Sequence, residues 1–422
     1  MNDRDTLKLF VAAVLSTVPA VLQAGGVRLA SQDAFASARG EAFAATADNA
    51  SAIYYNPAGI TQLDGSNLRG GIYGIHFDPS FVPPAPANTN TFHIKNELAA
   101  VPEFFYARTL ESLPLSFGLG MYAPYGLGVI WPQDTGFRAV AVKSQLTYLR
   151  FNPVVAVKLP ANISLAAGVM VDYSKIDLEQ GLRANELPPP FVDYFKFEGD
   201  GWSVGYNLGL LWQPHEKLSL GATFRSATTV KMSGHTEVEF FPVIPNPYVS
   251  GAHANFTFPM TAVFGISYRP TEKWNLEIDA DYTDWSSFGT ITIHQDNPNI
   301  NVQPNPDFTL NWQPSWLYEF GVTRYFDNGW HASAGYVYSE NSAPDKHYTP
   351  LVPDLNKHFI SIGAGHKGRR WDFDVMYQFG YGPTRTVTGS TPSTVGQIAG
   401  QSADGKYGFI SHAVLVSAGL HF

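Results

Sequence analysis

The 422-residue chain contains no cysteine and few charged residues. Without Cys, a disulfide framework, a thiolate nucleophile and any Cys-ligated zinc or iron–sulfur site are excluded. Charged residues make up 15% of the chain, against roughly 25% in an average soluble domain. The net charge is −9, from 27 basic and 36 acidic residues. Nucleic acid is therefore not an expected partner, because binding it requires a basic surface.

Long hydrophobic runs are also missing beyond the N-terminus. A transmembrane helix needs about 18 consecutive apolar residues, and no later segment approaches this, so a helical membrane protein is excluded. The apolar stretch at 9–22 follows Arg4 and Lys8 and precedes small residues at 24–25. This order is typical of a secretory signal peptide. We predict a signal peptide over 1–24, with a buried N-terminal helix as the alternative.

What the chain does contain is aromatic residues, glycine and a repeated alternation of side-chain type. Aromatics make up 14% of the chain, which has 38 Gly. In 274–283 and 371–379, apolar and polar side chains alternate strictly. Such segments are about ten residues long and begin or end with aromatics, which is typical of transmembrane strands between lipid and a polar lumen. A soluble sandwich would also alternate, but with strands nearer five or six residues.

The spacing of the alternating segments predicts the architecture. Six short gaps of three or four residues alternate with seven long gaps, as expected for a barrel with short turns on one side of a membrane and long loops on the other. We therefore predict an all-β fold, a 14-stranded antiparallel transmembrane β-barrel in the outer membrane of a Gram-negative bacterium. Phe422 at the C-terminus is typical of such barrels. The predicted strands are 67–77, 101–110, 115–122, 145–158, 163–180, 200–213, 218–232, 255–269, 274–285, 314–326, 330–340, 357–367, 371–381 and 408–422.

Residues 25–66 do not alternate and are rich in Ala, Ser, Gly and Asp. A barrel this wide leaks unless it is filled, because barrel diameter grows with strand number. We therefore predict a hatch, or plug, over 25–66, followed by the barrel over 67–422. A loose periplasmic tail is the alternative, although Phe35 and Phe43 favour a packed segment.

Motifs in this segment resemble a known family. The sequences at 34–43, 48–52 and 55–60 are similar to the N-terminal hatch of the FadL-type long-chain fatty acid transport family, and 118–127, 151–153, 311–312 and 352–354 continue the similarity. The resemblance implies that outer loops capture a hydrophobic molecule, which passes to an internal site near the hatch. The molecule then leaves sideways into the bilayer, through a gap made by a kink in the third strand. Burial of apolar surface, at about 25 cal/mol per Å², is able to drive such steps.

Three groups of site residues follow from this comparison and from the loop composition: hatch residues, residues at a gap in the third strand, and an apolar groove in the outer loops. The alternative to the gap is an ordinary loop after the third strand, and the alternative to the groove is loop-to-loop packing over the barrel mouth. The hatch residues are Phe35, Phe43, Asn56, Pro57 and Ala58; the strand-three gap residues are Gly118, Gly120, Met121, Pro124, Tyr125 and Gly126; and the outer-loop apolar groove comprises Phe81, Trp131, Phe191, Phe240 and Phe241.

A fatty acid requires a cationic side chain at the internal site, because burying an unpaired carboxylate is costly. Candidate contacts for a fatty-acid headgroup are Lys143, Arg150, Lys175 and Arg324. Family members that take fatty acids tend to have basic residues around the internal site, but Gln313 stands before the tenth predicted strand here. Uptake of a neutral aromatic hydrocarbon or ester, as in the toluene-uptake branch, is therefore the alternative to uptake of a fatty acid.

No catalytic residue, metal site or cofactor is predicted. The acidic residues within 277–281 and 372–374 occupy alternate strand positions and are expected to be hydrated in the lumen. The expected partners are a hydrophobic small molecule, outer-membrane lipid and lipopolysaccharide, and the protein is expected to be a monomer. A general diffusion porin and a barrel lipid hydrolase remain as further alternatives.

Overall fold

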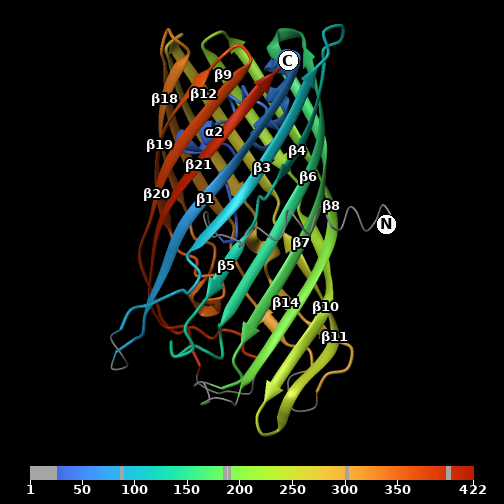
Figure 1. Cartoon of the computed structure of the whole chain (residues 1–422), viewed down its shortest axis with the longest axis vertical. Helices are drawn as coiled ribbons and strands as arrows, with labels where there is room; N and C mark the ends of the chain where they lie inside the picture. The colour runs from blue at the N-terminus through green and yellow to red at the C-terminus, as the bar shows by residue number, and fades with distance from the viewer. Residues whose placement is uncertain (1–25, 86–89, 184–187, 189–191, 300–303, 396–400) are drawn as a thin grey trace.

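The computed structural model describes residues 26–85, 90–183, 188, 192–299, 304–395 and 401–422. The predicted signal peptide and Phe191 lie outside these residues. The described chain forms a closed, antiparallel, 14-stranded barrel, which confirms the predicted fold class. Figure 1 shows the strands tilted steeply around a lumen that holds the short helices.

Fourteen strands cross the wall, and three of them are interrupted. The wall strands are β1 (Ser66–Val82), β3 (Leu98–Thr109), β4 (Leu115–Tyr122) with β5 (Leu127–Ile130), β6 (Lys143–Leu159), β7 (Ile163–Gln180), β8 (Asp193–His215), β9 (Leu218–Arg225) with β10 (Thr228–Phe240), β11 (Ile244–Phe258) with β12 (Thr261–Thr271), β13 (Trp274–Thr283), β17 (Ser315–Tyr325), β18 (Trp330–Ser339), β19 (Lys357–Lys367), β20 (Trp371–Val387) and β21 (Gly405–His421). Short strands β2 (Phe92–His93), β14 (Thr290–Thr292), β15 (His294–Gln295) and β16 (Asp307–Thr309) lie in the long connections.

The barrel closes where its first strand meets its last. β1 pairs with β21 from Asn67↔His421 to Val82↔Lys406. Ser66 and Phe422 also exchange backbone hydrogen bonds of 2.8 and 2.9 Å. The start and the end of the barrel therefore lie together at the end with the short turns, which is uppermost in Figure 1. We call the two ends of the barrel the short-turn end and the long-loop end.

Several strands extend beyond their predicted boundaries at the long-loop end. The region 233–254, predicted as a long loop, is a hairpin in which β10 and β11 pair until Phe240↔Ile244. The outward positions here carry polar residues such as His235 and Glu237. Because these residues lie outside the apolar band, the alternation of apolar and polar side chains that marks a membrane strand is lost.

The outer wall carries the apolar band expected of a lipid-facing surface. On β8, outward side chains run from Trp202, which is 50% exposed, to Trp212, which is 41% exposed. Ten residues at about 3.3 Å each, on strands tilted by about 40°, span roughly 25 Å, which matches the apolar height of an outer-membrane barrel. The exposed residues between these two are Val204, Tyr206, Leu208 and Leu210.

The predicted hatch segment lies inside the barrel, near the short-turn end. It contains helices α2 (Ala34–Ala38) and α3 (Ala52–Tyr55) and the 3₁₀ helix η1 (Pro57–Gln62). Asp33 caps α2 by accepting from the backbone amides of Phe35 and Ala36. None of the helices in the described ranges is long and apolar enough to cross a membrane.

Glycines in the wall let the hatch backbone approach closely. A Cβ on Gly335 would lie 2.0 Å from the backbone nitrogen of Gly40, and one on Gly221 would lie 2.1 Å from the carbonyl oxygen of Ala44. No larger residue fits at either position, so these glycines mark where the hatch backbone contacts the wall.

Candidate functional site

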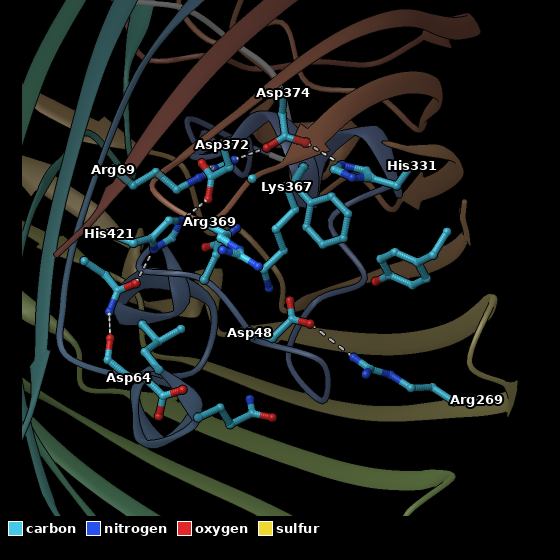
Figure 2. A pocket seen from close by; sticks show the side chains of 17 residues that line it. Asp48, Asp64, Arg69, Arg269, His331, Lys367, Arg369, Asp372, Asp374 and His421 are labelled. Atoms are coloured by element: carbon cyan, nitrogen blue, oxygen red, sulfur yellow. Dashed lines mark hydrogen bonds and ion pairs between the residues drawn. The ribbon is translucent and has the colours of Figure 1, made fainter. Parts of the chain in front are cut away.

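An arginine on the first strand fastens the hatch to the barrel. The Arg69 guanidinium pairs with Asp33 of the hatch, and it donates to Asp372 at 2.8 Å and to Asp374 at 2.6 Å on β20. All four side chains are almost fully buried. His331 contacts Asp374 at 2.6 Å, which extends the network that Figure 2 shows around Arg69. One guanidinium thus compensates three buried carboxylates.

The acidic residues of β13 bind the hatch backbone, and they are not the hydrated lumen charges that we expected. Asp279 accepts from the amides of Phe43 and Ala44, both at 2.8 Å. Glu277 accepts from the amide of Ala45 at 2.7 Å and from Arg39 at 3.1 Å. Both carboxylates are buried. Their alternate spacing on the strand does place them in the lumen, but the hatch occupies the space that water was expected to fill.

The predicted hatch residues pack together and against the wall. The Asn56 side-chain amide donates to the carbonyl oxygens of Ala44 at 2.7 Å and of Leu210 on β8 at 2.9 Å. Its side-chain oxygen accepts from the amide of Ala58 at 3.2 Å, and Pro57 begins η1. Asn56 therefore joins two parts of the hatch to each other and to the barrel. The rings of Phe35 and Phe43 also meet edge to face, 5.6 Å apart.

A polar pocket of about 410 Å³ lies between the hatch and the short turns (Figure 2). Asp48 of the hatch accepts from Arg269 at 3.1 Å there, and Lys367 and Arg369 also line the pocket. Burial alone would raise the pKa of Asp48, but Lys367 and Arg269 lower it below its ordinary value. The charged lining makes this pocket a poor site for an apolar molecule.

The wall is interrupted between β4 and β5, at residues 123–126. The register of β3 with β4 ends at Phe104↔Met121, and the chain resumes as a strand at Leu127. The N-terminal part of the hatch takes the place of a strand partner: the Leu29 amide donates to the Pro124 carbonyl, and the Gly126 amide to the Val27 carbonyl, both at 2.9 Å.

The predicted gap residues divide into two groups in the structure. Pro124, Tyr125 and Gly126 lie in the interruption itself. Gly118, Gly120 and Met121 lie in the intact part of β4, which pairs with both of its neighbours. A Cβ on Gly118 or on Gly120 would touch Ile53 of the hatch, at 2.8 and 2.9 Å. These two glycines make room for the hatch and do not border the opening that we expected.

An apolar cavity of about 60 Å³ lies in the long-loop half of the lumen, next to the interruption. Val27 and Leu127 both line it. The polar residues in its lining are Ser144 and Thr349, and none of the described lining residues is Lys or Arg. The other lining residues are Leu146, Ile176, Leu178, Phe256, Phe258, Phe288, Ile291, Phe308, Leu310, Leu351 and Val352.

The predicted headgroup contacts do not reach this cavity. Lys143 and Lys175 project outward and pair with Asp177 at 2.5 Å and Glu198 at 2.7 Å. Arg324 also projects outward and lies over the Trp274 ring. Arg150 faces the lumen, but Asp172 binds it at 2.6 and 2.9 Å. None of the four lines the cavity.

The predicted outer-loop groove is largely packed shut. Trp131 is fully buried and donates through its indole nitrogen to the Pro350 carbonyl at 2.9 Å. Phe81 is buried against Phe137, with their ring centroids 4.7 Å apart. Phe240 and Phe241 are half-buried. For Phe81 and Trp131 the structure therefore shows loop-to-loop packing, and no exposed groove forms at these two residues.

Sequence reasoning missed most of the cavity lining. Val27 belongs to the non-alternating N-terminal segment, and Phe288 and Phe308 lie in a long connection. The available signal was the apolar character of the inward positions on β6 and β7, namely Leu146, Ile176 and Leu178. In a water-filled barrel those positions would be polar.

A closed barrel with an internal hatch and an apolar chamber defines a class of outer-membrane channels that handle hydrophobic molecules. The sequence places the chain within this class: it belongs to the family described as "Outer membrane protein transport protein (OMPP1/FadL/TodX)", which it matches over residues 13–416. It is a Gram-negative outer-membrane transport protein.

Known relatives span most of the chain. A long-chain fatty acid transport protein of Escherichia coli O6:H1 is 23% identical over 352 residues, which cover 76% of this chain and 78% of the relative. Outer membrane protein P1 of Haemophilus influenzae is 23% identical over 415 residues, covering 86% and 87%.

Solved structures share the fold. A Pseudomonas aeruginosa FadL homologue superposes with a TM-score of 0.81 at 18% identity, covering 94% of this chain and 100% of the homologue. The Ralstonia pickettii toluene transporter TbuX gives a TM-score of 0.69 at 17% identity, covering 92% and 98%.

Proposed function

We propose that this protein is a passive channel for hydrophobic compounds, which leave the lumen sideways through the interruption between β4 and β5. The observation that carries the proposal is the position of the apolar cavity. Val27 and Leu127 line it, and Val27 bonds to Gly126 inside the interruption. A molecule in the cavity is therefore separated from the wall opening by the Val27–Leu29 segment.

On this proposal, the structure corresponds to a closed state of the route. Its cavity measures about 60 Å³, whereas an apolar protein cavity that binds benzene measures about 150 Å³. Displacing Val27–Leu29 would enlarge the cavity and, in the same movement, break the backbone hydrogen bonds that this segment makes to Pro124 and Gly126. Two backbone hydrogen bonds, each contributing about 1 kcal/mol net, oppose that movement. The buried ion pair of Arg28 with Asp281 opposes it as well, so opening must break that pair or leave Arg28 in place.

The lining favours a neutral ligand over a fatty acid. Relatives are named for long-chain fatty acids and for toluene, so the family alone does not decide the substrate. A carboxylate in this cavity would meet only apolar groups and two hydroxyls. Leaving its charge unpaired is costly, so we propose that the cavity takes uncharged molecules.

The test is an engineered disulfide across the interruption. Because the chain has no native Cys, the two introduced cysteines have no other intramolecular partner. Arg28 bridges Tyr125 in antiparallel register, which places Val27 opposite Gly126. Opposed residues of an antiparallel pair lie about 4.5–5.5 Å apart, within the range of a disulfide. The double variant Val27→Cys/Gly126→Cys should lose uptake of toluene when oxidised and regain it when reduced.

The two single variants, treated with the same oxidant and reductant, are the controls. They carry the same changes in side-chain volume without the cross-link. Undiminished uptake by the oxidised double variant, with the disulfide verified by mass spectrometry, would overturn the proposed exit route.

A further inference from the structure

The barrel wall contains a seam on the other side of the cavity, formed by residues 201–206 of β8 and the facing stretch 226–232. Regular pairing of β8 with β10 ends at Asp200↔Ser233, and pairing of β8 with β9 begins only at Asn207. Within these described stretches, no residue is opposed to another in the ladder across the seam. One stretch is a residue longer than the other, as at a β-bulge, but a bulge disrupts pairing only locally.

The seam lies in the apolar band of the outer wall. Trp202, Val204 and Tyr206 point outward from it, and Val204 is 69% exposed, more than any other apolar side chain of the band on β8. Trp202 marks the long-loop edge of the band, so the seam lies in the outer leaflet if the long loops face outward, as they do in such barrels. Unpaired strand edges are costly in lipid, because no water is available to bond their backbone groups. A loss of pairing at this depth therefore requires an explanation.

Glycines allow the two strands to overlap at the seam. A Cβ on Gly201 would lie 2.3 Å from the carbonyl oxygen of Lys231 and 3.0 Å from the Val230 side chain. A Cβ on Gly205 would lie 2.5 Å from the Thr228 side chain. These two glycines alternate with the outward residues of β8, so their missing side chains would point into the lumen. β10 therefore reaches across the lumen side of β8, and side chains fill the wall where ladder pairing is lost.

The seam lies directly behind the apolar cavity. Ile176 and Leu178 of β7 line the cavity on one side, and Phe256 and Phe258 of β11 line it on the other. β8 and β10 lie between β7 and β11 in the wall. On β10, Val230 is opposed to Phe256 in register. Three fully buried side chains of β8 and β10 occupy the space between these two parts of the lining, and we call them the gate: Phe197, Val230 and Met232.

We infer that the seam is a second lateral portal, through which apolar molecules dissolved in the outer leaflet enter the cavity. This inference rests on the proposed function, because it requires a cavity that takes apolar molecules, and it adds an entrance to the exit between β4 and β5. The gate consists of apolar side chains, whose packing is non-directional, and Met232 is unbranched and adaptable. The exit, in contrast, is held by backbone hydrogen bonds and by the ion pair of Arg28.

The test measures whether a reagent dissolved in lipid reaches the gate. Val230→Cys places a single thiol behind the seam, because the chain has no native Cys. The variant in phosphatidylcholine liposomes is treated with the apolar reagent N-phenylmaleimide, and the adduct is followed by mass spectrometry. Ser174→Cys is the matched control, since Ser174 is equally buried and lies opposite Gly201 on β7, but is paired on both sides. We expect Val230→Cys to react at least about tenfold faster, because the reaction of a buried group reports local opening.

A second substitution identifies the side from which the reagent arrives. Val204→Trp enlarges an outward side chain at the seam and should slow the labelling of Val230→Cys several-fold. Leu208→Trp, at an outward position in the paired part of β8, is the control and should leave the rate unchanged. Equal labelling of Val230→Cys and Ser174→Cys overturns the inference. Fast labelling that Val204→Trp does not slow also overturns it, because the reagent then arrives through the lumen.

The disulfide between positions 27 and 126 tests the proposed function separately. If the oxidised disulfide abolishes toluene uptake but Val230→Cys reacts no faster than Ser174→Cys, the inference fails and the proposed function stands. If the disulfide has no effect, but labelling is fast and is slowed by Val204→Trp, the proposed exit fails and the entrance stands.

Discussion

The two halves of the lumen are held together by different forces. In the short-turn half, directional bonds from Arg69, Glu277, Asp279 and Asn56 fix the hatch to the wall. In the long-loop half, aromatic and aliphatic side chains pack around a small cavity, as in the edge-to-face contact of Trp285 with Phe288.

The short-turn half is therefore suited to sealing the barrel, and the long-loop half to binding a ligand. Hydrogen bonds and ion pairs depend on geometry, so a buried polar network specifies one arrangement. Apolar burial is non-directional and scales with area, so an apolar chamber is able to rearrange around a guest. The protein thus keeps a rigid seal next to a chamber that deforms, and each of the following predictions changes one half.

The largest expected effect comes from removing the arginine of the seal. Arg69→Ala leaves Asp33, Asp372 and Asp374 without the guanidinium that compensates them, which costs about 3–5 kcal/mol for a buried network. The hatch should loosen and admit small polar solutes, measured as faster swelling of proteoliposomes in arabinose. Arg370→Ala, at an exposed turn, is the control. Unchanged swelling of the Arg69 variant would show that the network does not hold the seal.

A charge placed in the chamber should reverse its preference. In Leu178→Lys, an ammonium group enters the cavity lining, where the described residues have no cation. Affinity for toluene should fall by about tenfold or more, because the charge must be desolvated, while benzoate should gain affinity. Leu178→Met preserves the volume and serves as the control. Equal toluene binding by the Lys variant would show that the ligand lies elsewhere.

A smaller effect is expected from the hatch amide. Asn56→Ala leaves the carbonyls of Ala44 and Leu210 without their side-chain donor, at a cost of about 1–3 kcal/mol. Hydrogen exchange of residues 44–58, measured by mass spectrometry, should become faster. The exchange rates of the strand segments in the long-loop half should not change. Asn328→Ala, at an exposed turn, should exchange like the wild type. Protection of 44–58 at the wild-type level would remove Asn56 from the set of anchors.

The smallest effect concerns pH. The pKa of Asp48 lies below its ordinary value, so its ion pair stabilises the hatch at every pH above the unfolded value of about 3.9 and is lost as the pH falls through the folded pKa. The protection factors of the hatch amides, which correct for the intrinsic pH dependence of exchange, should be constant around neutral pH and fall in acid. A partly exposed pair contributes at most about 1 kcal/mol, so Asp48→Asn should only reduce the acid slope. An identical slope in both proteins would assign it to other carboxylates.

The fold was predictable because the alternation of side chains records which face of a strand meets lipid. The strand number and the regular exchange of short turns with long loops followed from that alternation, and the hatch followed from the non-alternating segment and the motif at 55–60. The outer ends of β10 and β11 were not predictable, since polar residues occupy both faces there. The role of Gly118 and Gly120 was also missed, because a glycine in a strand looks the same whether it bends the strand or makes room for a neighbour.

The sequence by itself determined that this chain builds a wall with two unlike faces, because a period of two assigns each side chain to the lipid or to the lumen. Only the tertiary structure decided which lumen residues meet. Arg69 reaches carboxylates 36, 303 and 305 positions away, and Val27 lies against Gly126. Strand register and the seating of the hatch in the lumen set such neighbours, and neither is encoded in the alternation.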